Sequence, residues 1–252
     1  MKLRYFSDLH LEFMKSLSIE DFMKKISPGK DEVCILAGDI GNPYQPNYDT
    51  FIKFIISNFK KTFLIAGNHE YYNKTKTMKE TNTFLHDYFQ QFPTISFLNN
   101  TCEKYEGICF LGATLWSKIT NPTNTINDVY RIPNFDIVQY NQLHTESIRF
   151  LEDALQSNAH EKCIVITHHM PSERLLDKKY TTKEMMPYNQ WFCCNMDELI
   201  TTYKASIQCW IYGHTHTPST HILEEIPFVC NPIGYPGENS DVNFDTTITI
   251  NL

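Results

Sequence analysis

Two histidines, His214 and His216, follow directly on the apolar run 207–211 and a glycine at position 213. In an extended segment, residues two apart point the same way, so both imidazoles can face one site. Neutral imidazole is the commonest nitrogen ligand of protein-bound metal ions. The spacing alone fits a hydrogen-bonded loop equally well, so the meaning of the pair depends on the rest of the chain.

Four other apolar runs also end in polar side chains that could bind a metal. The five clusters are Asp8/His10, Asp39, Asn68/His69, His168/His169 and His214/His216. Six of the ten histidines lie in these clusters, which random scatter would rarely produce. Open α/β sheets bind their ligands at the carboxyl ends of the strands, so we expect the five clusters to converge on one edge.

The chemistry of these side chains fits two divalent metal ions. The candidate groups are too many for one tetrahedral zinc site and suffice for two sites of higher coordination number. Asp39 lies on a glycine-rich turn, where its carboxylate could bridge both ions. Two such ions against Asp8, Asp39 and one hydroxide leave a net positive centre, because Asn68 is neutral. Such a centre should attract a phosphate and stabilise a charged transition state.

Buried strands and amphipathic helices must position these groups. A continuous apolar run such as 33–37 is typical of a strand buried on both faces. Thr77 with Glu80 predicts a capping box, and Ser18 and Asn195 are predicted N-caps of two other helices. Further strands are expected at 95–98, 108–112, 221–223, 227–230 and 246–250. The residues alone therefore indicate an α/β domain with a strand-rich C-terminal part.

The composition limits which compartments and which partners are expected for this protein. The 252 residues carry a formal net charge of -7, so a long nucleic acid or an acidic membrane is not expected as a partner. No apolar run approaches the roughly 20 residues of a membrane span, and the N-terminus lacks the apolar core of a signal peptide. The eight scattered cysteines suit free thiols in a reducing compartment. We expect a cytoplasmic protein with a single domain over 1–252 and leave its oligomeric state open.

The clusters, taken with their neighbours, form recognisable motifs. They are Asp8-Leu9-His10, Gly38-Asp39-Ile40-Gly41, Gly67-Asn68-His69-Glu70, His168-His169 and Gly213-His214-Thr215-His216. In order and spacing this set resembles the five signatures of the calcineurin-like metallophosphoesterase superfamily. The stretches 7–13, 67–72, 112–116 and 231–236 are similar to a compact, single-domain microbial-type branch of it. The resemblance implies a four-layer α-β-β-α sandwich of two mixed β-sheets flanked by helices, with a binuclear metal site at the strand ends.

The resemblance also implies a role for each residue. Asp8, His10 and His216 would hold the first metal, Asn68, His168 and His214 the second, and Asp39 would bridge them. His69 would contact the phosphate and protonate the leaving oxygen. Met170 separates His169 from Pro171, where many members have His-His-Pro, so His169 stays an alternative to His168 as ligand. The ions would be two divalent or mixed-valence metals from the set Mn, Fe, Zn, Ni and Co.

The stretch 114–140 is long and polar, and such loops usually carry function. It contains Trp116, Asn127, Asp128 and Arg131, so we expect a rim or lid in which Arg131 helps to stabilise the phosphate. The alternative is a solvated loop in which Arg131 merely pairs with Asp128.

The expected function is hydrolysis of a small phosphorylated substrate by attack of a metal-bridging hydroxide. A phosphodiester is favoured, because no cluster of Arg or Lys beyond Arg131 is evident for a dianionic phosphate. One alternative is a phosphomonoesterase acting on a small metabolite or a protein. An alternative of another class is a non-catalytic scaffold of the same fold, which should have lost ligands, especially at His69 or the paired histidines. None is lost here.

Overall fold

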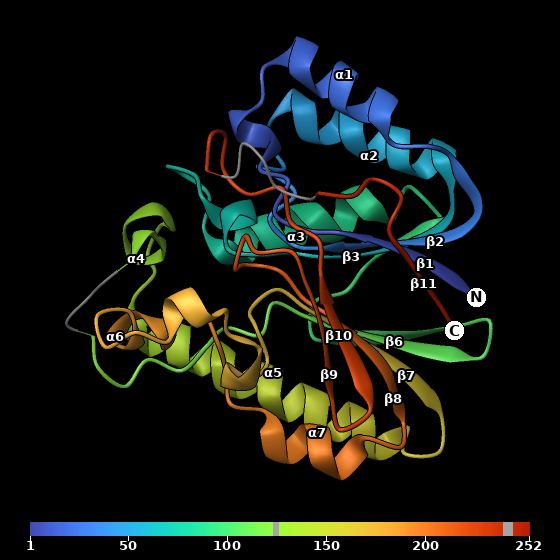
Figure 1. The fold of residues 1–252 in the computed structure, drawn as a ribbon. Helices are drawn as coiled ribbons and strands as arrows, with labels where there is room; N and C mark the ends of the chain where they lie inside the picture. The colour runs from blue at the N-terminus through green and yellow to red at the C-terminus, as the bar shows by residue number, and fades with distance from the viewer. Residues whose placement is uncertain (123–125, 239–243) are drawn as a thin grey trace.

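Two mixed β-sheets form the centre of the protein (Figure 1). The computed structural model describes residues 1–122, 126–238 and 244–252. The first sheet has the order β11 (Thr249–Asn251), β1 (Lys2–Phe6), β2 (Gly29–Ala37), β3 (Phe59–Ile65) and β4 (Ile95–Phe97). The second has the order β5 (Thr101–Tyr105), β6 (Ile108–Ala113), β7 (Lys162–Thr167), β8 (Ile207–Ile211), β10 (Ile226–Cys230) and β9 (Ser219–Leu223). Strands β11, β5 and β9 pair antiparallel at the edges, and the inner pairs are parallel.

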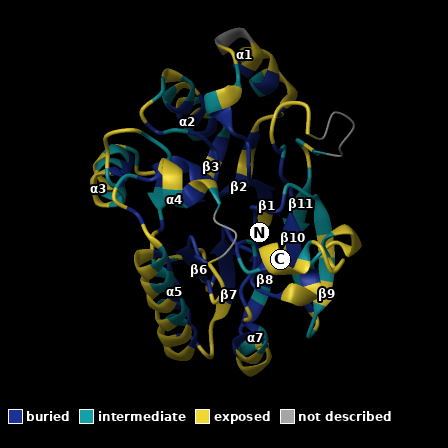
Figure 2. Ribbon diagram, turned by 90° about the vertical axis from the view of Figure 1, so that its left-hand side faces the viewer, coloured by how far each residue is buried: buried dark blue, intermediate teal, exposed yellow. Residues whose placement is uncertain are grey.

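Helices cover the outer face of each sheet. On the first sheet lie α1 (Ser16–Lys25), α2 (Pro46–Asn58) and α3 (Met78–Phe89), and on the second lie α5 (Ile137–Ser157) and α7 (Asp197–Tyr203) (Figure 1). The short helices α4 (Asn127–Arg131) and α6 (Met186–Asn189) lie at one end. Exposed residues concentrate on the outer sides of the helices, and the strands are largely buried (Figure 2). The predicted four-layer sandwich is confirmed.

Strand β2 shows why its sequence is apolar without alternation. Val33 and Ile35 belong to the core between the two sheets, whereas Cys34 and Leu36 belong to the core under the first group of helices. Successive strand residues point to opposite faces, so both faces require apolar side chains. Phe63 and Phe110 join the sheets across the middle, with ring centroids 4.0 Å apart.

The loops that follow the parallel strands meet at one edge of the sandwich. The amide of Asp8 donates to the Gly38 carbonyl, and the amide of Gly213 donates to the His168 carbonyl, each over 3.0 Å. Gly38 has a φ of +84°, and a Cβ there would lie 2.7 Å from the Gly67 nitrogen. Only glycine permits this approach, so the motif loops after β2 and β3 pack directly together.

Several local predictions need correction. Helix α1 begins at Ser16 after Lys15, and α7 begins at Asp197 after Met196, so neither Ser18 nor Asn195 is an N-cap. A side-chain cap typically stabilises a helix start by only about 1 kcal/mol, and neither start has one. The capping box of Thr77 is present as predicted.

Other predicted elements differ from the structure in their length or position. The last strand is shorter and later than predicted, at 249–251. Strand β5 was not predicted, because its edge sequence 101–105 is mostly polar and exposed. The stretch 114–140 is not irregular throughout, since it holds α4 and the first turn of α5. All eight cysteines are free thiols, as expected. No helix in the described ranges is long and apolar enough to cross a membrane.

Candidate metal centre

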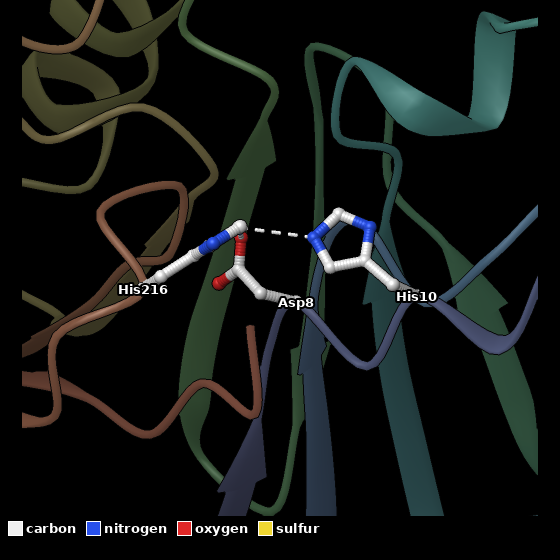
Figure 3. Close-up of side chains that lie close together, drawn as sticks. All are labelled: Asp8, His10 and His216. Carbon is white, nitrogen blue, oxygen red and sulfur yellow. Dashed lines mark hydrogen bonds and ion pairs between the residues drawn. The ribbon is translucent and has the colours of Figure 1, made fainter. Parts of the chain in front are cut away.

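Asp8, His10 and His216 form one group of possible metal ligands (Figure 3). Their ligand atoms all lie within 4.8 Å of one another. The Nε2 atoms of His10 and His216 are 3.0 Å apart, and His216 Nε2 lies 3.5 Å from Asp8 Oδ1. Asp8 and His10 follow β1, and His216 follows β8, so this group joins the two sheets.

Asp39, His168 and His214 form a second group with the same compactness. His168 Nε2 lies 3.4 Å from Asp39 Oδ2 and 3.0 Å from the amide oxygen of Asn68, which places Asn68 at this group. Asp39 Oδ2 also lies 3.8 Å from His10 Nε2. The Asp39 carboxylate therefore lies between the two groups. His214 and His216 belong to different groups although they are neighbours in the chain.

The ring of His169 packs on His214, with ring centroids 4.2 Å apart, but both of its nitrogens have partners outside the two groups. Its Nε2 lies 3.3 Å from the Tyr140 hydroxyl, and its Nδ1 lies 3.3 Å from the Thr114 carbonyl. Of the paired histidines, the structure therefore brings His168 to the cluster. The assignment of His168 as the ligand stays a prediction that this geometry favours.

Five of the seven predicted ligands have a left-handed backbone. The residues are Asp8, His10, Asp39, His214 and His216, with φ between 48° and 70°. Such a conformation costs a non-glycine residue roughly 1–2 kcal/mol, so it persists only where the surroundings impose it. Strained residues of this kind gather at functional sites, and here they aim five side chains at one small volume.

The side chains present fit a pair of metal ions. The buried Nε2 of His214 has no hydrogen-bond partner among the described residues. The two Nε2 atoms of His10 and His216 face each other at 3.0 Å, an approach that needs a proton or another cation between them. Imidazole, carboxylate and amide oxygen together suit the divalent transition metals.

The pKa shifts in the two groups also fit the binding of metal ions. Burial works to raise the pKa of Asp39, but His168, His69 and His10 hold that pKa well below its usual value. Burial works to lower the pKa of His168, but the Asp39 carboxylate outweighs it and raises the pKa to about 10. Burial, with His169 and His168 nearby, holds the pKa of His214 well below its usual value. The carboxylates thus attract positive charge, and a divalent cation would displace the protons they hold on imidazole.

His69, the predicted proton donor, is held from two sides. Its Nδ1 lies 2.8 Å from Glu12 Oε1, and its Nε2 lies 2.9 Å from the Tyr235 hydroxyl. Glu12 also lies 3.3 Å from His10 Nδ1, so one carboxylate orients both imidazoles. The sequence alone assigns no role to Glu12 or Tyr235. Both residues lie in stretches that carry the family resemblance, 7–13 and 231–236, and that was the signal that could have marked them.

Glu70 ties together the loops that carry Asp39 and Asn68. Its Oε2 accepts the amides of Asp39 at 3.0 Å and Gly67 at 2.7 Å. Its Oε1 accepts the amides of Ile40 at 2.8 Å and Gly41 at 3.3 Å. A fully buried carboxylate with four backbone donors fixes the relative position of these two loops.

Asp128, on α4, orients the amide of Asn68. Asn68 Nδ2 donates to Asp128 Oδ1 over 2.8 Å, and the Tyr72 hydroxyl donates to the same oxygen over 2.5 Å. With its NH₂ group directed there, Asn68 presents its oxygen to His168. The stretch 114–140 thus reaches the site through Asp128. Arg131 is exposed at the end of α4 and does not line the pocket, so the structure does not bring it to the cluster.

A pocket of about 310 Å³ opens beside the two groups. Its lining includes Asp39, Asn68, His214 and His216. It also includes apolar side chains from Ile126 and from the segment 176–192. A ligand in the pocket can therefore contact both the candidate metal groups and hydrocarbon.

Residues 1–218 match the sequence model of the family described as calcineurin-like phosphoesterase, and the chain belongs to that family. Membership supports metal-dependent hydrolysis of phosphate esters. An uncharacterised protein of Acanthamoeba polyphaga mimivirus, L509, is 33% identical in an alignment that covers 96% of this chain and 94% of the viral protein.

Two solved structures share the fold at low identity. The phosphopantetheinyl hydrolase PptH of Mycobacterium tuberculosis is similar with a TM-score of 0.72 and 16% identity, over 94% of this chain and 91% of that one. GAP50, described as the anchor in the inner membrane complex of Plasmodium, is similar with a TM-score of 0.51 and 11% identity, over 93% and 71%. At these identities the likeness concerns the fold.

Proposed function

We propose that this protein is a binuclear metal-dependent phosphodiesterase that acts on a small substrate. The observation that carries the proposal is the position of Asp39 Oδ2, 3.8 Å from His10 Nε2 in one group and 3.4 Å from His168 Nε2 in the other. Asp8, His10 and His216 would hold the first ion, Asn68, His168 and His214 the second, and Asp39 both. When bound, such ions supply an activated water and neutralise the charge on the phosphate.

His69 is the proposed proton donor to the leaving oxygen. Glu12 holds Nδ1 of His69, and Nε2 points to the Tyr235 hydroxyl, which itself lines the pocket. The Asp39 and Glu12 carboxylates outweigh burial and raise the pKa of His69, which favours the protonated ring. Arg131, the predicted stabiliser of the phosphate, is exposed and lies outside the pocket lining.

The preference for a diester rests on charge. No Lys or Arg is among the described residues that line the pocket, so a dianionic monoester would find no side-chain cation beyond the metal centre. A diester carries one negative charge less on phosphorus. One structural relative is named as a hydrolase of phosphopantetheinyl groups, which fits a small esterified phosphate.

Asp39→Asn tests the proposal directly. With Mn²⁺ and bis(p-nitrophenyl) phosphate, the variant should lose more than the roughly 100-fold that outer-shell substitutions at metal sites typically cost. Asp31→Asn, an exposed change on β2, is the matched control and should keep full activity. Unchanged turnover in Asp39→Asn would refute the mechanism.

Two further measurements separate the alternatives. A higher kcat/KM for p-nitrophenyl phosphate than for the diester would favour a phosphomonoesterase. Metal analysis of the purified protein distinguishes the enzyme from a non-catalytic scaffold, since about two ions per chain are expected for the enzyme.

A further inference from the structure

We propose that the pocket selects phosphodiesters in which the second esterified group is small, uncharged and apolar. This inference rests on the proposed function and adds the part of the substrate that does not react. It is carried by the lining of the pocket, which combines the candidate metal ligands with apolar side chains and holds no Lys or Arg among the described residues.

One part of the pocket lining, here called the apolar wall, consists of apolar and aromatic side chains. They are Ile126, Leu176, Tyr180, Met185 and Phe192. Each is only partly buried, so its remaining surface can face a ligand in the pocket. Phe192 also packs on His214, with ring centroids 5.1 Å apart, which brings this wall into direct contact with the second group of ligands. Apolar surface buried by a substrate here would contribute to binding in proportion to its area.

The charges in the lining disfavour a second anion on the substrate. Asp128 and Glu238 line the pocket in addition to Asp39, and none of the 16 lining residues is Lys or Arg. The buried Oδ2 of Asp128 has no hydrogen-bond partner in the part of the chain that the structure describes. The nearby Lys178 and Lys179 are exposed and lie outside the lining. A carboxylate or second phosphate on the substrate would therefore meet like charge.

The size of the pocket sets the scale of the group. A cavity of about 310 Å³ is at the lower end of the range for small-molecule sites. It accommodates a single ring or a short chain next to the phosphate. A polymer or a phosphorylated protein segment would project out of it.

Three phosphodiesters that share the same leaving group and differ in the second ester group test this selectivity. Each carries p-nitrophenol, and the second ester group is methyl, phenyl or carboxyphenyl. Hydrolysis adds water across the P–O bond, releases p-nitrophenol and leaves the monoester, so the reacting bond is the same in all three. We expect kcat/KM for the phenyl ester to exceed both others by about tenfold or more.

Met185→Lys and Met186→Lys are the matched variants. Met185 lines the pocket, whereas its neighbour Met186 is 62% exposed and does not. Met185→Lys should raise the carboxyphenyl-to-phenyl ratio of kcat/KM by about tenfold, and Met186→Lys should leave the ratio unchanged. Turnover of all three esters without discrimination, or an equal response of the two variants, would overturn the inference alone. No turnover of any ester by the metal-loaded protein would overturn the proposed function as well.

Discussion

Replacing Glu70 with glutamine should destabilise the protein and loosen both metal groups. The two oxygens of Glu70 accept four backbone amides from the loops around Asp39 and Gly67. Glutamine has nearly the same shape but one oxygen, so its NH₂ group must face two of these amides. Two buried donors then lose their acceptor.

The size of the effect follows from that count. A buried polar group left without its partner costs about 1–3 kcal/mol, so two of them cost roughly 4 kcal/mol. This is a large share of the 5–15 kcal/mol by which folded domains are typically stable. The same change shifts the loop of Asp39 against that of Asn68, so metal affinity should fall as well.

Urea denaturation of Glu70→Gln, with metal present and after chelation, measures both effects. Glu152→Gln, an exposed change on α5, is the control and should stay within about 0.5 kcal/mol of the parent protein. A loss below about 1 kcal/mol in Glu70→Gln would show that the four amides do not depend on this carboxylate.

Three other predictions concern the metals and the core. Metal analysis should show that His214→Ala and His216→Ala each lose one of two ions and that the double variant loses both. Loss of only one ion in the double variant would mean that the two histidines share a site. Asp128→Ala should weaken metal binding about tenfold or more in a metal titration, because Asn68 loses the acceptor of its NH₂ group, and unchanged affinity would contradict that role. Burial lowers the pKa of His144, so the unfolded chain takes up a proton before the native protein as pH falls through about 6.5, and stability falls. The loss of unfolding free energy between about pH 7.5 and about pH 5.5 should therefore be smaller in His144→Asn than in the parent protein. An equal loss would show that His144 does not cause this pH dependence.

The sequence by itself determined the strands and the residues at their ends. An apolar run that stops at Gly38-Asp39 or Gly67-Asn68 carries both kinds of information locally. The apolar run indicates a strand buried on both faces, and the polar residues at its end indicate a ligand site at the edge of the sheet. Helix starts were less certain, because a polar residue such as Ser18 offers only a small local advantage as an N-cap.

The family resemblance implied how the ligands divide into two groups, but only the tertiary structure shows which side chains lie together and what supports them. His214 and His216 are two residues apart, yet one lies beside Asp39 and the other beside Asp8. Asp128 reaches Asn68 across 60 positions of the chain, and Tyr235 reaches His69 across 166. Local patterns carry no record of such contacts, since they exist only once the strands have aligned their ends and the remaining polar groups have found partners.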